Sequence, residues 1–353
     1  MNTFGKKIKI TLFGASHEEY IGLTITGFPA GIEPDYELIA KRLAQRRGLM
    51  NLTSKRLEKD DYLFISGIFQ GKTTGAPLTV LIKNQDLKSE DYQKYYGIAR
   101  PSHADFTQYL KYQGYEDYRG GGISSGRLTV AFIILGALAE TILKKKGILV
   151  ASRLKSVYTV IDEDDNPSLA DLIRLKEEDF PVLNFESKAK MLAIIEETKA
   201  ACDSLGGVVE TWVAGLAAGF GEPFFESVES QLSHLLFSVP GVKGIEFGSG
   251  FQITKMKGSH ANDEMYYEDG EVRYYSNHSG GINGGITNGN LICFRTAFKP
   301  TPSIALPQRT INFLEKENTE ITISGRHDTI YAIKALHVVN ALSNYAILDL
   351  IES

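Results

Sequence analysis

A run of three glycines that leads into a long apolar segment is the feature that most constrains the fold of this chain. The glycines are Gly120 to Gly122, and the apolar run VAFIILGALA spans residues 130–139. This run has about half the length that a bilayer span requires. Ser125 is a suitable N-cap, and three lysines before Gly147 suit the C-terminal end of a helix. We therefore expect a buried core helix that begins where the glycines end.

The glycine triplet itself needs a physical reason. Glycine contributes no side-chain packing and costs backbone entropy, so three in succession indicate a tight turn or a ligand that approaches the main chain closely. The first turn of the following helix offers unpaired N–H groups on the same side, a geometry that suits an anion. We expect a ligand to approach Gly120 to Gly122.

The rest of the chain mixes strand-like and helical patterns. Alternation predicts strands at KIKITLFG, YLFISGIFQG, PLTVLIKN, VVETWVAG and KGIEFGSGF, and GKTTG (71–75) reads as a hairpin turn. Helical spacing predicts helices at DYELIAKRLAQRRG, SKAKMLAIIEETKAACDSLGG and ESQLSHLLFSVP, and over roughly 329–351 with Asp328 as N-cap. Because no repeat or linker divides the chain, we expect a single α+β domain over residues 1–353.

Composition limits the classes of function. The 353 residues carry 38 basic and 43 acidic side chains, a net charge of −5, so the chain as a whole does not attract nucleic acid or anionic lipid. Any anionic ligand must therefore bind in a local basic pocket. The two cysteines, Cys202 and Cys293, lack metal-type spacing, and we expect both to be buried, without a disulfide or a bound metal. The N-terminus has no cleavable signal pattern, which favours a cytoplasmic protein without a membrane segment.

Reactive side chains gather in six glycine-containing or proline-containing stretches. Singly, each has an ordinary structural explanation, but four of the seven histidines lie in them together with several arginines. Histidine exchanges protons near neutral pH, and arginine binds carboxylate and phosphate oxygens in pairs. The combination predicts acid–base chemistry on a polyanion. The stretches are GASH (14–17), RPSHAD (100–105), GGGISSGR (120–127), SNHSGGINGGITNG (276–289), FKPTPS (298–303) and GRHD (325–328).

Two common nucleotide-binding motifs do not fit. GGGISSG is superficially similar to a dinucleotide fingerprint, but YEDYRG before it makes a poor buried strand and no acidic residue follows at the required distance. GKTTG contains letters of a phosphate-binding loop without the upstream glycine.

In this order, these motifs resemble those of the chorismate synthase family, and the similarity runs almost end to end. It is carried by TLFGASH, GLTITGFPAG, RPSHADFT, DYRGGGISSGR, SVPGVKGIEFGSGF, NHSGGINGGITNG, FKPTPSI and GRHD. The resemblance implies a β-α-β sandwich, a homotetramer, and a lyase that eliminates phosphate from 5-enolpyruvylshikimate 3-phosphate to give chorismate. It also implies a need for reduced FMN without net redox change, and an external source of that reduced flavin.

The resemblance also implies roles for individual residues. His17 would protonate the departing phosphate, His103 would keep the flavin in its proper protonation state, and Asp328 would help flavin N5 accept the C6 proton. The substrate-binding candidates are Arg46, Arg100, Arg127 and Arg326. The FMN-binding candidates are Ser124, Ser125, His260, Ala261, Gly284, Lys299, Pro300, Thr301, Pro302, Ser303 and Arg326.

Several positions depart from the family pattern. Ala15 and Glu18 replace the usual Glu and Gly around the first histidine, and Thr329 replaces a proline. Ile123 stands where the family has a flavin-contacting arginine, and Leu128 stands where it has glutamate. A basic residue expected for nicotinamide-nucleotide (NADP) binding appears as Asn51 or Leu52. The loss of one arginine–phosphate contact would weaken binding about tenfold to a hundredfold.

Two alternatives to an active chorismate synthase follow from these departures. The chain could be a non-catalytic relative that keeps the fold as a binding or assembly protein, or a flavin-dependent enzyme with an altered substrate. Retention of both histidines, the aspartate and the remaining arginines favours the active enzyme.

Overall fold

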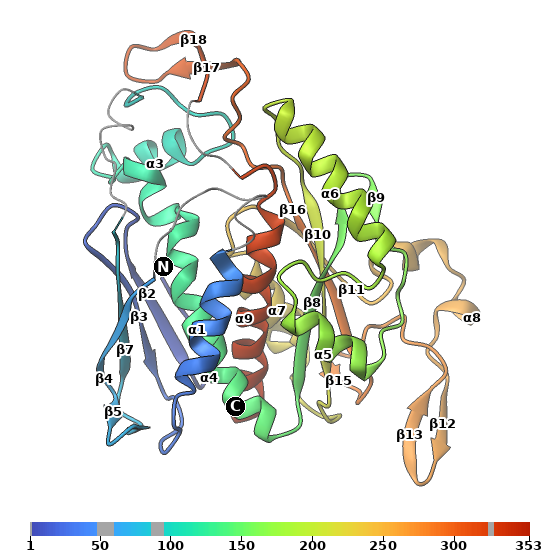
Figure 1. Cartoon of the computed structure of the whole chain (residues 1–353). Coiled ribbons are helices and arrows are strands. Elements are labelled where there is room, and N and C mark those ends of the chain that lie inside the picture. The colour runs from blue at the N-terminus through green and yellow to red at the C-terminus, as the bar shows by residue number, and fades with distance from the viewer. Residues whose placement is uncertain (1, 48–59, 86–94, 324–327) are drawn as a thin grey trace.

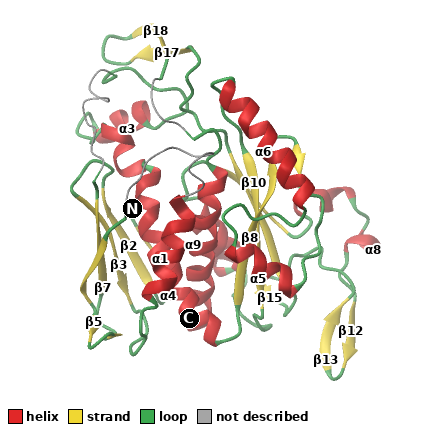
Figure 2. Cartoon of the chain, viewed as in Figure 1, coloured by secondary structure: helices red, strands yellow, loops and turns green. Residues whose placement is uncertain are grey.

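The chain forms three layers, with helices between two antiparallel sheets (Figure 1). In this computed structural model the described residues are 2–47, 60–85, 95–323 and 328–353. The first sheet has the order β1-β2-β3-β7-β4, and the second has the order β11-β16-β10-β8-β9. Figure 2 shows the helices α1, α4 and α9 between the two sheets. This arrangement is the expected β-α-β sandwich.

Each sheet is antiparallel at every pairing. The strands of the first sheet are β1 Thr3–Phe4, β2 Lys9–Gly14, β3 Tyr20–Thr26, β7 Leu78–Lys83 and β4 Tyr62–Ser66. The strands of the second sheet are β11 Val242–Phe247, β16 Ile292–Phe298, β10 Gly207–Ala214, β8 Leu149–Val157 and β9 Val160–Ile161.

The central layer is built on the predicted apolar helix. α4 (Val130–Lys145) packs against α9 (Ala332–Glu352), and α1 (Tyr36–Arg47) and α7 (Val228–Leu236) pack on α9 as well. A Cβ at Gly136 would lie 2.4 Å from the Ala341 Cα, so the close crossing of α4 and α9 requires glycine there. The segment Arg119–Lys145 is long and apolar enough to cross a membrane, but 83% of its most apolar window is buried inside the molecule. Burial of this kind is typical of a core helix.

Smaller elements extend from the layers. α3 (Asp105–Tyr112) lies above the first sheet, while α5 (Leu169–Glu177) and α6 (Phe185–Ala200) lie beside the second (Figure 1). The 3-10 turns are η1 Arg119–Ser124, η2 Gly126–Thr129, η3 Phe224–Glu226 and η4 Gly250–Lys255, and α8 is Gly258–Ala261. The hairpins are β5 Ile68–Phe69 with β6 Lys72–Thr73, β12 Met265–Glu268 with β13 Glu271–Tyr274, β14 Ile282–Asn283 with β15 Ile286–Thr287, and β17 Gln308–Asn312 with β18 Glu317–Ile321.

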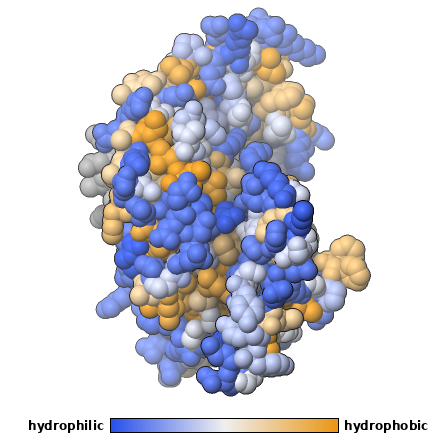
Figure 3. All heavy atoms as spheres, turned by 90° about the vertical axis from the view of Figure 1, so that its right-hand side faces the viewer, coloured by the Kyte–Doolittle hydropathy of each residue, from blue (hydrophilic) through white to orange (hydrophobic). Residues whose placement is uncertain are grey.

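One face of the molecule is mostly hydrophilic. Figure 3 shows the side that carries α6 and α8, where hydrophobic residues appear in patches between hydrophilic ones. On this side α8 and the hairpin β12–β13 project away from the layered body (Figure 1). We call residues 250–274 the arm.

Some local predictions are wrong. α4 begins at Val130 and not at Ser125, because Ser125 caps the short turn η2 by accepting a hydrogen bond from the Arg127 N–H. α9 begins at Ala332, so Asp328 is not its N-cap. α6 ends at Ala200, well before Gly206, because Cys202 adopts a left-handed backbone conformation that stops the helix.

Two further predictions also need correction. Cys202 is exposed, and Cys293 is only partly buried. Within GKTTG, Lys72 and Thr73 form strand β6, so the turn lies one residue earlier, at Gln70 and Gly71.

Candidate active site

His17 lies directly against the glycine triplet. It follows β2, and its backbone neighbour Ser16 donates an N–H to the Gly122 carbonyl at 3.2 Å. The Ser16 hydroxyl lies 3.1 Å from His17 Nδ1 and donates to the Arg119 carbonyl at 3.0 Å. The imidazole is only 8% exposed. These bonds fix the ring against the 3-10 turn η1.

The structure explains the glycine triplet in more detail than the sequence does. A Cβ at Gly120 would lie 2.2 Å from His17 Cε1, and one at Gly122 would lie 2.3 Å from the Asp117 carbonyl oxygen. At Gly121 the nearest atom is Ser125 Cβ at 3.9 Å, so space remains there. All three have positive φ angles. Protein atoms therefore require the first and third glycines, and Gly121 alone leaves room for another molecule.

His103 is held in one orientation by two hydrogen bonds. Its Nδ1 lies 3.0 Å from the Pro101 carbonyl and its Nε2 lies 2.8 Å from the Ser303 hydroxyl. A carbonyl only accepts, so Nδ1 carries the proton and Nε2 accepts from Ser303. Burial, followed by the charge of Arg100, lowers the pKa of His103 to about 4. The imidazole is therefore neutral at pH 7.

The FKPTPS stretch meets the His103 loop. The Lys299 ammonium group donates to the Ser102 carbonyl at 2.6 Å, and Ser303 bonds to His103 as described. The Thr301 carbonyl accepts from Ser204 at 2.6 Å, while the Thr301 hydroxyl is buried without a hydrogen-bond partner among the described residues. Gly206 packs closely on Pro300, and Pro302 lies with Pro300 in the segment that connects β16 to β17.

The predicted arginines have partners of their own. Arg100 forms a two-pronged ion pair with Asp105, at 2.8 Å and 2.7 Å. Arg127 pairs with the buried Asp60 and donates to Asn84 at 2.9 Å. These carboxylates offset much of the positive charge that the sequence alone suggested. Asp105 lies in the same RPSHAD motif as Arg100, so their pairing could be predicted from the sequence. No local sequence pattern connects Asp60 with Arg127.

Of the other predicted charged residues, Arg46 bonds to the turn η2, and Asp328 bonds to α9. Arg46 donates to the Gly126 carbonyl at 3.0 Å and to the Thr129 hydroxyl at 3.1 Å. Asp328 accepts from the Lys334 ammonium group at 2.8 Å. Arg326 lies outside the described residues.

A cavity of about 510 Å³ opens beside η1 and η2. Its walls include Ser124, Ser125 and Lys299, and also Lys243, which the sequence analysis missed. Among the described lining residues there is no aspartate or glutamate, although the whole chain is acidic. The two departures Ile123 and Leu128 both line this cavity. Together they remove one charge of each sign relative to the family pattern, so the net charge of the lining is unchanged.

Few of the predicted site residues line this cavity. Ser124, Ser125 and Lys299 do, whereas the lining does not include His17, His103, Asp328, Arg46, Arg100, Arg127 or the residues Pro300 to Ser303. Three further predicted cofactor residues are also absent from it. His260 and Ala261 lie in α8 on the arm, on the opposite side of the molecule from α3 (Figure 1). Gly284 lies in the turn between β14 and β15, where a Cβ would have no neighbour within 4 Å. Within one chain, these residues are separate from Ser124, Ser125 and Lys299.

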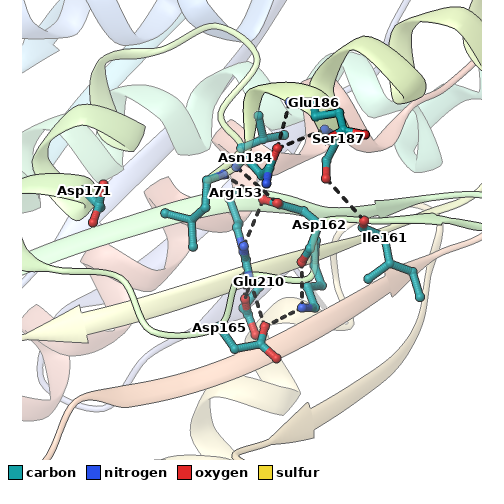
Figure 4. Close-up of polar contacts among 12 residues, drawn as sticks. Arg153, Ile161, Asp162, Asp165, Asp171, Asn184, Glu186, Ser187 and Glu210 are labelled. Atoms are coloured by element: carbon teal, nitrogen blue, oxygen red, sulfur yellow. Dashed lines mark hydrogen bonds and ion pairs between the residues drawn. The ribbon is translucent and has the colours of Figure 1, made fainter.

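A second charged cluster, which the sequence analysis did not predict, lies in the second sheet (Figure 4). Fully buried Arg153 donates to Glu210 at 2.9 Å and 2.6 Å and to Asp162 at 2.9 Å, and its guanidinium group lies 5.0 Å from the Trp212 ring. Arg295 donates to the other Glu210 oxygen at 2.8 Å. We call these residues the Arg153 cluster. Every charge in it has a partner of opposite sign, which is typical of a structural network.

The comparison with known families decides which protein family this is. The family model described as chorismate synthase matches residues 8–351. The chain belongs to the chorismate synthase family. A chorismate synthase of Korarchaeum cryptofilum is 40% identical over 98% of this chain and 96% of its own length, and that of Chitinophaga pinensis is 40% identical over 99% and 96%.

A solved structure supports the fold. It is described as a crystal structure of chorismate synthase and superposes with a TM-score of 0.78 over 99% of this chain and 92% of its own, at 24% identity. The predicted family and the predicted α+β fold class are confirmed. Chorismate synthases are lyases of the shikimate pathway, which leads to the aromatic amino acids. Their reaction is the anti-1,4-elimination of phosphate from 5-enolpyruvylshikimate 3-phosphate.

Proposed function

We propose that the chain carries out the chorismate synthase reaction around the 510 Å³ cavity, and that reduced FMN binds there. The observation that carries this proposal is the charge of the lining. It includes Lys243, Lys299 and His234, but no carboxylate among the described residues. Reduced flavin, its phosphate group and a substrate with two carboxylates and a phosphate are all anionic. They repel one another in a water-poor site unless fixed cations surround them.

The residues at the cavity fit FMN. A volume of about 510 Å³ lies within the usual range of small-molecule sites. Lys299 offers an ammonium donor, and Ser124 and Ser125 offer hydroxyl groups at the wall. Thr301 does not line the cavity but lies two residues after Lys299, and its buried hydroxyl lacks a partner among the described residues, which is costly unless a ligand bonds to it. When bound, reduced FMN would supply electron density that assists the cleavage of the carbon–oxygen bond.

We assign His17 the protonation of the departing phosphate. Its ring is oriented by Ser16 and by contact with Gly120, and it is shielded from bulk water. General acid catalysis by a positioned imidazole typically accelerates a reaction by about 10²- to 10⁴-fold. The Asp117 carboxylate interacts electrostatically with His17. Burial raises the pKa of Asp117, but hydrogen bonds from Arg119 and the nearby positive charges outweigh burial, so the pKa of Asp117 is lowered.

We assign His103 and Asp328 to the flavin. His103 is neutral, and its Nε2, which accepts from Ser303 in this structure, would accept a flavin proton in place of the Ser303 hydroxyl without adding charge. The Asp328 carboxylate would assist the bound flavin in accepting the C6 proton. Its bond to Lys334 holds the side chain in place.

We further propose that Arg46, Arg100, Arg127 and Arg326 contact the substrate. Arg100 and Arg127 share their charge with Asp105 and Asp60, so their contribution would be directional hydrogen bonds more than net charge.

Family membership supports the remaining inferences. We infer a single catalytic domain, a soluble cytoplasmic enzyme, a homotetramer and a separate reductase that supplies reduced flavin. His260, Ala261 and Gly284 remain proposed FMN contacts. The positions expected to bear on NADP binding, Asn51 and Leu52, lie outside the described residues, so NADP binding stays a prediction.

One assay tests the proposed function. Purified protein is mixed without oxygen with 5-enolpyruvylshikimate 3-phosphate and chemically reduced FMN, and chorismate and phosphate are measured together. We expect equal amounts of both and no net oxidation of the flavin. Failure to bind either ligand would instead support a non-catalytic relative. Binding of FMN without turnover would support an altered substrate.

A further inference from the structure

Lys243 occupies an irregular position in the second sheet. β11 pairs with β16, and the register shifts between Val242 and Gly244, so Lys243 is the extra residue of a β-bulge. Lys243 is one of the residues that line the 510 Å³ cavity. Bulges redirect a side chain out of the regular alternation, and they are frequent beside functional sites. The bulge therefore accounts for a lysine that faces the cavity at the end of a strand.

Lys299 lies on the neighbouring strand connection. It follows the last residue of β16, Phe298, which pairs with Val242 next to the bulge. Both lysines line the same cavity. Burial, followed by the positive charge of Lys243, lowers the pKa of Lys299. The two ammonium groups are thus close enough to repel each other.

Neither lysine has a compensating carboxylate. Among the described residues, no aspartate or glutamate oxygen lies within ion-pair distance of Lys243 or Lys299. Arg100, Arg127 and Arg153, in contrast, each have an acidic partner. Two like charges at one cavity cost free energy unless a ligand of opposite charge binds between them.

We propose that Lys243 is a ligand-binding residue that forms, with Lys299, a site for a phosphomonoester dianion. A dianion matches two ammonium charges, whereas a single carboxylate would leave one of them uncompensated. The three terminal oxygens of a phosphate group can also accept hydrogen bonds from both lysines at once. This inference rests on the proposed function, because the phosphate would belong either to FMN or to the substrate.

The experiment compares Lys243→Met and Lys243→Arg with the wild type and with Lys72→Met. Lys72 is an exposed strand lysine on the β5–β6 hairpin and does not line the cavity, so its loss controls for net charge. Dissociation constants are measured for FMN and for riboflavin, which lacks the phosphate. Inorganic phosphate is tested separately by its effect on the melting temperature. Each variant's melting temperature without ligand checks its folding.

We expect Lys243→Met to weaken FMN binding about tenfold, the usual effect of a lost charge-assisted hydrogen bond. Riboflavin binding should change less than twofold, and stabilisation by inorganic phosphate should fall. Lys243→Arg should retain most FMN affinity, and Lys72→Met should match the wild type.

The outcomes separate the two phosphate sources. Weaker FMN binding with unchanged riboflavin binding supports the site with flavin as the source. Unchanged FMN binding with a raised KM for the phosphorylated substrate supports it with substrate as the source. Unchanged values for FMN, substrate and inorganic phosphate in Lys243→Met would overturn the inference. If the wild type bound neither FMN nor riboflavin, the proposed cofactor would be contradicted. The inorganic phosphate measurement alone would then test whether Lys243 binds phosphate.

Discussion

The Arg153 cluster and the 510 Å³ cavity are two polar regions of this molecule, and they differ in whether their charges are balanced by residues of the chain. In the cluster, fully buried Arg153 is balanced by Glu210 and Asp162. In the cavity, Lys243 and Lys299 face a lining without a described carboxylate. In a balanced buried network the chain compensates its own charges, so that loss of one partner is costly, whereas an unbalanced network is compensated by a ligand. The difference teaches that the balance of charge, more than its amount, separates a structural region from a binding region.

The largest expected effect is on stability and comes from the Arg153 cluster. Glu210→Gln removes the charge that Arg153 and Arg295 share, and leaves buried guanidinium groups without their main partner. The free energy of unfolding should fall by about 3–5 kcal/mol, measured by urea denaturation. Lys243→Met should change it by less than about 0.5 kcal/mol, because Lys243 is exposed. Equal losses in both variants would remove the distinction between the two regions.

The next largest effect is on catalysis, through the contact of Gly120 with His17. Gly120→Ala places a Cβ where the imidazole now lies, so His17 must move. We expect kcat to fall about 100-fold, which corresponds to about 2.7 kcal/mol. Gly71→Ala in the β5–β6 hairpin is the matched control, because Gly71 also has a positive φ and no atom lies within 4 Å of the added carbon. A similar kcat in the two variants would contradict the placement of His17 in the reaction.

A third effect concerns pH and His103. The unfolded chain binds a proton at its ordinary pKa near 6.5, whereas burial and Arg100 lower the pKa in the folded chain to about 4. Between these values the unfolded state binds more protons, so the free energy of unfolding should fall as pH falls from about 6.5 to 4, by on the order of 1–3 kcal/mol. His103→Gln should reduce that slope in denaturation measured across pH. An unchanged slope would mean that His103 is not held neutral by the fold.

The smallest effect concerns the two departures from the family pattern. Leu128→Glu adds a carboxylate to the cavity, so FMN binding should weaken about threefold to tenfold through repulsion. Ile123→Arg in the same chain should restore most of that loss, because it supplies a cation facing the same cavity. Dissociation constants of the single and double variants give the coupling directly. Additive effects would show that the two positions act independently.

The sequence predicted the main helices and strands well, because the apolar run of α4 and the alternation in the long strands are strong local signals, whereas their arrangement in layers was implied by the resemblance to the family. Helix ends were predicted less well. Asp328 has the composition of an N-cap, but Lys334 binds its carboxylate and the helix begins at Ala332. Ser125 caps a 3-10 turn ahead of the main helix. Such choices depend on contacts that a short sequence window does not contain.

The candidate site was predictable in its residue types but not in its charge balance. The order of the motifs predicted that His17, His103 and the glycine triplet belong to one functional site. The pairing of Arg127 with Asp60 joins residues 67 positions apart, and no local sequence pattern predicts this ion pair. Lys243 faces the cavity only because of a bulge in β11, which depends on pairing with β16. Glycine is the opposite case, because three glycines in succession contribute no side-chain packing and so indicated a close approach to the main chain, as found at Gly120.

The most direct test is a crystal structure of the protein with FMN and the substrate bound. We predict that the flavin occupies the cavity beside Ser124 and Ser125, with the phosphate group of FMN or of the substrate in hydrogen-bond contact with Lys299 and Lys243. Flavin density in a different part of the molecule, with both lysines facing solvent alone, would contradict it.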